Sequence, residues 1–225
     1  MAHKVYLGVG HGGSDPGAVA NGFKEKDVNL TIALACAQVL QKYDVQVTLS
    51  RTTDEDAELT QRIRQCNTFA PDLALDIHNN AGGGDGAEVY HHHGGGIGKL
   101  LAQNILEQLT ALGQNSRGAK TRLNSQGSDY FGFIRQTAAP AVIVECAFLD
   151  NAKDLQIVDT SAEQAAMGAA IARGILKTLG ISYEEREKTI YRVQVGAYSM
   201  RENAEAMLKK LEDAGFSGFI LSAAE

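Results

Sequence analysis

The stretch KVYLGVGHGGSDPGA, residues 4–18, joins an apolar run to a glycine-rich loop. The run Val5–Val9 has the composition of a buried strand. The glycines that follow fit G-x-G-x-x-G, a pattern of loops that bind the pyrophosphate of a dinucleotide. However, His11 stands inside the loop, and imidazole is a common metal ligand. The stretch therefore raises two alternatives, a nucleotide-binding loop and a metal-binding loop.

The residues after the loop argue against nucleotide binding. A dinucleotide loop leads directly into a helix, because the helix N-terminus binds the pyrophosphate. Here the turn-forming segments Ser14–Gly17 and Asn21–Gly22 come first, and the first helix signal is a candidate N-cap at Asp27. The second expected strand leads into Arg51, where a dinucleotide fold usually has an acidic residue for the ribose. The metal-binding alternative is therefore favoured.

Strand-like and helix-like stretches alternate along the first 181 residues. The expected strands cover Val5–Val9, Val45–Ser50, Leu73–Ile77, Ala87–His91 and Ala141–Cys146. The expected helices cover Asp27–Gln41, Glu58–Phe69, Ile97–Leu112 and Ala162–Leu179. This alternation predicts an α/β fold with a mostly parallel sheet flanked by helices on both faces. The polar segment Gln114–Asp129 is expected to be a surface loop.

A change in composition after Ile181 predicts further parts of the chain. Residues 182–189 are polar and charged, as is typical of a linker. Residues 190–225 show strand alternation over Tyr191–Ala197, then a helical stripe that ends near Gly215, then a second strand-like run that begins with Phe219–Leu221, which predicts a small β-α-β tail. A unit of this size buries little core by itself. We therefore expect that further chain or a second copy completes it.

The bulk composition excludes several classes of protein. The net charge is −6 with both signs mixed along the chain, which argues against a nucleic-acid binder. Cys36, Cys66 and Cys146 lie in apolar stretches without C-x-x-C spacing and are expected to be buried, reduced thiols. No run approaches the roughly 18 apolar residues of a membrane span. The first residues lack the apolar segment of a signal peptide, so we expect synthesis in the cytoplasm and action elsewhere only after release.

Three candidate metal ligands lie near the ends of expected strands. His11 follows the first strand, Glu25 lies on the long loop after it, and His78 ends the strand LALDI. The carboxyl ends of parallel strands meet at one edge of the sheet, where open α/β folds place their sites. Two imidazoles and a carboxylate, with a fourth position open, are the pattern of a catalytic zinc site.

Glu145 is a fourth candidate, because it interrupts the apolar strand AVIVEC. A carboxylate is costly to bury without a partner, and a nearby cation or water network would explain it. Taken singly, each of the four residues also fits a structural role. The run His91–His93 is less informative, because neighbouring strand residues face opposite ways and cannot all reach one metal. We interpret these histidines as solvent or rim residues.

Six motifs together resemble the zinc-dependent N-acetylmuramoyl-L-alanine amidases of the amidase_3 type. In chain order they are GHGGSDPGA, KEKDVNL, SRTTD, LTQRIRQCN, DIHNNA and PAVIVECAFLDN. The resemblance implies a twisted, mostly parallel sheet and a zinc amidase catalytic domain over residues 1–181. It implies Zn²⁺ bound by His11, Glu25 and His78, with Glu145 as the catalytic carboxylate. DIHNN stands where the family more often has Ser-Ile-His, and it keeps the histidine.

The resemblance implies hydrolysis of the amide between the lactyl group of N-acetylmuramic acid and L-alanine of the peptidoglycan stem peptide, which lyses the cell wall. Two alternatives stay open: a cell-wall-binding protein without activity, and a zinc peptidase that cuts within the stem peptide. Residues 190–225 resemble the first half of a SPOR repeat, a family that binds peptidoglycan. An oligomer could form through this incomplete repeat. Both a phage lysin and a lysis enzyme of a spore-forming mother cell are compatible with these features.

Overall fold

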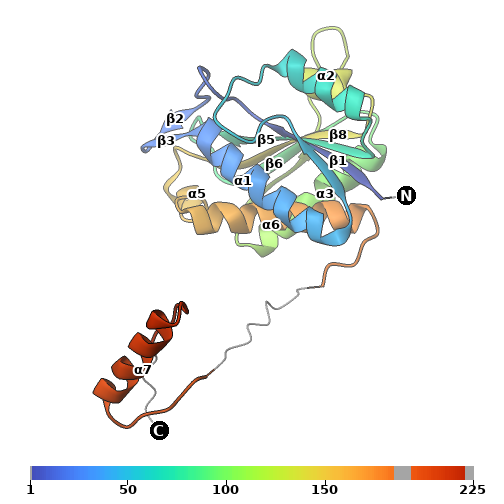
Figure 1. The fold of residues 1–225 in the computed structure, drawn as a ribbon. Helices are drawn as coiled ribbons and strands as arrows, with labels where there is room; N and C mark the ends of the chain where they lie inside the picture. The colour runs from blue at the N-terminus through green and yellow to red at the C-terminus, as the bar shows by residue number, and fades with distance from the viewer. Residues whose placement is uncertain (1, 185–193, 221–225) are drawn as a thin grey trace. The chain divides into compact units, whose positions relative to one another are not determined.

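The computed structural model describes residues 2–184 and 194–220, and the chain divides into two compact units after Tyr183. The first unit is built on a six-stranded sheet with the strand order β4-β1-β5-β8-β6-β7. Helices cover both faces of this sheet (Figure 1). The predicted α/β class is therefore confirmed.

The elements of the first unit follow the predicted order. The strands of the main sheet are β1 (Lys4–Val9), β4 (Gln46–Leu49), β5 (Leu73–Asn80), β6 (Ala87–His91), β7 (Ser116–Lys120) and β8 (Ala141–Phe148). A small hairpin pairs β2 (Val19–Ala20) with β3 (Phe23–Lys24). The helices are α1 (Glu25–Leu40), η1 (Gln41–Tyr43), α2 (Leu59–Phe69), α3 (Gly96–Ala111), α4 (Gly132–Gln136), α5 (Ala152–Leu155) and α6 (Ser161–Thr178).

Strand β7 corrects the prediction of one continuous loop over Gln114–Asp129. Its sequence is polar, but it lies at the edge of the sheet beside β6, where a strand needs no apolar faces. Strand β6 in turn runs antiparallel to β8, whereas β1, β4, β5 and β8 are parallel. Only residues 81–86 separate β5 from β6, and a parallel return needs a crossover of about a dozen residues or more.

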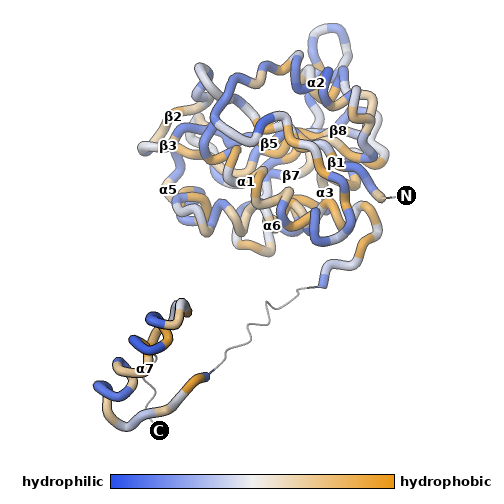
Figure 2. The backbone as a smooth tube through the Cα atoms, viewed as in Figure 1, coloured by the Kyte–Doolittle hydropathy of each residue, from blue (hydrophilic) through white to orange (hydrophobic). Residues whose placement is uncertain are grey.

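The two faces of the sheet carry separate hydrophobic cores. The larger core joins the sheet to α1, α3 and α6, and the smaller one joins it to α2 and α4 through residues such as Tyr6 and Phe133. Figure 2 shows hydrophobic segments along the central strands. Helices α1 and α6 lie so close that a Cβ on Gly168 would be 2.3 Å from the Ile32 carbonyl oxygen. All three cysteines are buried and free, as predicted.

The second unit contains one helix, α7 (Arg201–Asp213), within its described part. This confirms the predicted helical stripe, but residues 194–200 and 214–220 form no strand. No residue of α7 is buried, so the helix offers no core against which flanking strands could pack. The remaining residues of the predicted strands, 191–193 and 221, lie outside the described residues. Among the described residues, no helix is long and apolar enough to cross a membrane.

Candidate active site

The strand register places three acidic or basic side chains in a row across one face of the sheet. His78 of β5 lies opposite Glu145 of β8, which lies opposite Glu88 of β6. Side chains alternate along a strand, so this row shares the face of Ala74 and Ile143, which pack in the core under α2 and α4. Along their strands, His78 comes after Ala74 and Glu145 comes after Ile143. The row therefore lies beyond these core residues, toward the carboxyl ends of β5 and β8.

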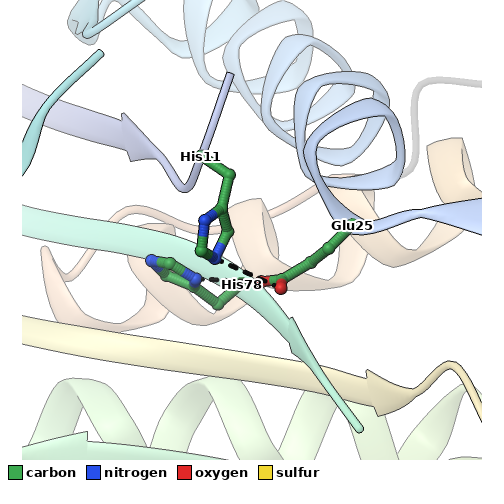
Figure 3. A group of neighbouring side chains, drawn as sticks. All are labelled: His11, Glu25 and His78. Carbon is green, nitrogen blue, oxygen red and sulfur yellow. Dashed lines mark hydrogen bonds and ion pairs between the residues drawn. The ribbon is translucent and has the colours of Figure 1, made fainter. Parts of the chain in front are cut away.

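His11 and Glu25 complete a cluster around His78 (Figure 3). His11 Nε2 lies 3.2 Å from Glu25 Oε2, and His78 Nδ1 lies 2.9 Å from Glu25 Oε1. The two imidazole rings meet edge to face, with their centroids 5.0 Å apart. One potential ligand atom from each residue lies within 4.8 Å of the others. The structure thus brings together the three side chains that the sequence singled out.

The cluster can form only because two neighbouring residues, Gly10 and Gly17, have no side chain. A Cβ on Gly10 would lie 2.3 Å from Cε1 of His78, and a Cβ on Gly17 would lie 2.6 Å from Oε2 of Glu25. His11 itself has a φ of +59°, a left-handed conformation that is uncommon outside glycine. Backbone of this kind is often found at functional sites, where the surrounding structure holds it.

Glu25 is the first residue of helix α1, which corrects the prediction of a loop position before a cap at Asp27. The hairpin of β2 and β3 turns the chain back, and the Glu25 amide donates to the carbonyl of Ala18. The Glu25 carboxylate in turn accepts from the Ala18 amide at 2.9 Å and from the Asn79 amide at 3.1 Å. These bonds fix the carboxylate between the two histidines.

Each imidazole has a second carboxylate on its other nitrogen. His11 Nδ1 lies 2.7 Å from Asp15 Oδ2, and His78 Nε2 lies 3.4 Å from Asp76 Oδ2. Asp76 is held by Arg62 at 3.3 Å. Metal-binding histidines commonly have such a carboxylate partner, which orients the ring. Sequence analysis did not identify Asp15 or Asp76 as part of the site, although the motif DIHNN marked Asp76 as a departure from the family.

The electrostatics of the cluster favour positive charge. Hydrogen bonding to Glu25 raises the pKa of His11 against the effect of burial. Burial alone would lower the pKa of His78, but Asp76 and Glu25 outweigh it and raise the pKa to about 10. Burial would likewise raise the pKa of Glu25, yet the two histidines hold it well below its usual range. Two imidazoles and a carboxylate in a cation-attracting environment fit a zinc ion.

Glu145 lies beside this cluster without a protein partner for one of its oxygens. Its Oε2 is buried and accepts no hydrogen bond from the described residues. Burial raises the pKa of Glu145 to about 7, although the nearby His78 acts to lower it. A carboxyl group with a pKa near neutrality can both accept and donate a proton. The unpartnered oxygen agrees with the expectation that a cation or water lies nearby.

Comparison with known proteins decides the family. The N-acetylmuramoyl-L-alanine amidase family matches residues 5–177, most of the chain. The chain belongs to this family. It is similar to the amidase CwlM of Bacillus licheniformis, with 34% identity over 97% of this chain and 84% of the relative. It is also similar to the sporulation-specific N-acetylmuramoyl-L-alanine amidase of Bacillus subtilis (strain 168), with 33% identity and the same coverage.

Solved structures agree with the amidase assignment. Cwp6 from Clostridium difficile superposes with a TM-score of 0.78 and 36% identity, over 80% of this chain and 30% of that one. The amidase AmiC2 of Nostoc punctiforme superposes with a TM-score of 0.73 and 29% identity, over 80% of this chain and 98% of that one. The predicted enzyme class, an N-acetylmuramoyl-L-alanine amidase on an α/β fold, is confirmed.

A SPOR domain matches residues 160–222, which confirms the predicted resemblance of the tail. The match begins before α6, a helix that packs against α1 and α3 in the first unit of the amidase. It therefore starts well before residue 190. The predicted division into residues 1–181, 182–189 and 190–225 stays a prediction.

The three consecutive histidines of the amidase do not behave alike. His91 is buried, which corrects its prediction as a solvent or rim residue. His91 is the last residue of β6 and faces α3. A Cβ placed on Gly98 of that helix would lie 3.9 Å from the His91 Cβ. His92 and His93 are exposed, as predicted, with side-chain exposures of 51% and 46%.

Proposed function

We propose that this chain is a zinc-dependent amidase that hydrolyses the bond between the lactyl group of N-acetylmuramic acid and L-alanine of the stem peptide. The observation that carries the proposal is the placement of Glu145, with its unpartnered Oε2, directly across the sheet from His78. His78 belongs to a cluster with the donor set of catalytic zinc. Membership of the amidase family supports the choice of substrate.

Three residues would hold the ion: His11 through Nε2, Glu25 through its carboxylate, and His78 through Nδ1. When bound, zinc supplies Lewis acidity, which polarises a carbonyl and lowers the pKa of water to roughly 7. Asp15 and Asp76 engage the remaining ring nitrogens, which selects the nitrogen that faces the ion. The bonds from the Ala18 and Asn79 amides keep Glu25 in place.

Glu145 would carry the proton transfers of the reaction. Amide hydrolysis needs a base that removes a proton from water and an acid that protonates the departing nitrogen. The Glu145 carboxylate takes the water proton as the new C–O bond forms. It then donates that proton to the nitrogen as the C–N bond breaks, which releases a free amine and returns the carboxylate. A pKa of about 7 suits both steps at neutral pH.

Peptidoglycan is the partner that both matched families support. Similar proteins include the sporulation-specific amidase of Bacillus subtilis and an endolysin of Bacillus phage SPP1, the latter 33% identical over 80% of this chain. We infer that the enzyme acts on the cell wall in lysis of a mother cell or of a phage host. We also propose that the tail, residues 190–225, allows copies of this chain to assemble into an oligomer.

Digestion of purified sacculi tests the proposal. We expect stem peptides with a free L-alanine amino group, identified by mass spectrometry, and intact glycan strands. A chelator should stop their release, and added zinc should restore it. Cleavage at an amide within the stem peptide would instead indicate a zinc peptidase. Binding to sacculi without any new amino group would indicate a cell-wall-binding protein without activity.

A further inference from the structure

A second cluster of possible metal ligands lies at the exit of β6. Asp129 Oδ2 lies 3.1 Å from His92 Nε2 and 2.9 Å from His93 Nδ1. One ligand atom from each of the three residues lies within 4.8 Å of the others. The Asp129 carboxylate is only 3% exposed, whereas both histidines are about half exposed. The cluster thus combines a buried anionic oxygen with two imidazoles that solvent and ions can reach.

The two nitrogen–oxygen distances, 3.1 and 2.9 Å, are close to the distance between two ligands of one metal ion. Ligand atoms at 2.0–2.1 Å from a tetrahedral zinc ion lie about 3.3 Å from one another. Asp129 Oδ2 faces both ring nitrogens. The other oxygen, Oδ1, accepts a hydrogen bond from the His93 backbone amide at 2.9 Å, which fixes the orientation of the carboxylate. Within the described part of the chain, no lysine or arginine side chain pairs with this carboxylate. Among the described residues, the carboxylate is therefore met by one backbone amide and by two imidazoles, which are neutral unless protonated.

The cluster is also held in place by the surrounding backbone. Arg135 donates through Nη1 to the carbonyl of Asp129 and, at 2.9 Å, to that of Tyr130. The His92 and His93 rings lie side by side, with centroids 4.4 Å apart. Such a preset arrangement needs little rearrangement to bind an ion. The sequence-based argument that three consecutive histidines cannot share one metal still holds, because His91 is buried on the α3 side and only the other two take part.

We propose that His92, His93 and Asp129 form a second binding site for a divalent transition-metal ion such as zinc. Imidazole ligands favour zinc, cobalt, nickel or copper over magnesium and calcium. The site is distinct from the His11 cluster. His91, the residue before His92, pairs with Val142 of β8. Val142 and Glu145 are three residues apart along this strand, a separation of about 10 Å.

An ion at this site would tie the segment between β7 and α4 to the end of β6. The segment matters to the active site, because Phe131 packs on Tyr90 with ring centroids 4.7 Å apart. The Tyr90 hydroxyl in turn donates to Glu88, the neighbour of Glu145 across the sheet. Because a bound ion would fix Asp129 to the end of β6, metal binding should slow amide hydrogen exchange in residues 121–131.

Cobalt titration of the full chain without a histidine tag tests the second site. The protein is first stripped with a chelator, and bound Co²⁺ is followed by its visible absorption and by elemental analysis. The parent for the test is the His11→Ala variant, which isolates the second site from the proposed catalytic one. We expect this variant to keep one ion, with slower exchange in residues 121–131 when the ion is bound.

Substitutions at the second site should then lower the affinity of the His11→Ala variant for its remaining ion roughly tenfold or more. His93→Ala removes a ligand, and Asp129→Asn is a milder variant that keeps an acceptor for the His93 amide. His3→Ala is the matched control, since His3 is an exposed histidine 3.5 Å from Asp72 and outside both clusters. The proposal is overturned if the His11→Ala parent binds no ion, or if both variants bind it as tightly as the parent. Zinc retained by wild type and His11→Ala alike, but lost from a His93→Ala variant of the wild-type chain, would support this site and contradict the catalytic one.

Discussion

Replacement of Gly10 by alanine is the sharpest test of the active-site geometry. The added Cβ would lie 2.3 Å from Cε1 of His78, 2.5 Å from its Nε2 and 2.6 Å from its Nδ1. Ordinary van der Waals contact begins at 3.4 Å, so the ring must move by about 3.4 − 2.3 = 1.1 Å. Gly10 does not have a positive φ, so the effect is steric and not a strain of the backbone.

A shift of this size exceeds what the proposed site tolerates. Metal–ligand distances are met within about 0.2 Å, and a misplacement of about 1 Å can lower a reaction rate by roughly 100-fold. We therefore expect Gly10→Ala to lower kcat/KM on purified cell walls by about 100-fold and to lower zinc content after dialysis. The crowding should also reduce the free energy of unfolding by about 1–3 kcal/mol.

The matched control is Gly98→Ala, in helix α3. Its Cβ would meet nothing closer than the Ala141 carbonyl oxygen at 3.6 Å, an ordinary contact. Alanine inside a helix is favoured over glycine by roughly 0.5–1 kcal/mol, so this variant should be as active as wild type and no less stable. Elemental analysis, circular dichroism and amine release are measured on both variants. A Gly10→Ala protein with wild-type zinc content and rate would refute the geometry.

Three further predictions concern buried charges. Glu145→Gln should keep zinc and fold but lose at least about 100-fold in amide hydrolysis, and an unchanged rate of amine release would remove its proposed role. Arg62→Met should cost about 3 kcal/mol or more in urea unfolding, because it removes the guanidinium partner of the buried Asp76 carboxylate and leaves it only the His78 ring at 3.4 Å. Burial opposes ionisation of Glu88, but hydrogen bonds from Lys120 and Arg117 outweigh it and lower its pKa. Its stabilising effect is therefore complete above its ordinary pKa of 4.5 and is lost as the pH falls further. The thermal stability of Glu88→Gln should accordingly lie below wild type at pH 7 and approach it below pH 4; a constant difference would contradict this.

Secondary structure was predictable where local periodicity is strong. The buried strands β1, β5 and β8 have apolar sequences, and α1, α2, α3 and α6 each carry an apolar stripe. Strand β7 was missed because an edge strand pairs on one side only, which leaves its residues free to be polar. The start of α1 was misplaced because the β2–β3 hairpin, and not a capping side chain, sets it.

The sequence by itself determined the order of the elements and the residues suited to chemistry, because side-chain type and periodicity are local properties. Only the tertiary structure decided which of them meet. Glu25 reaches His78 across 53 positions of the chain, and Asp129 reaches His93 across 36. The carboxylates Asp15 and Asp76 gain their roles in the same way, from the ring nitrogens they face. Contacts of this kind arise from strand register and the path of the loops, which no short window of sequence records.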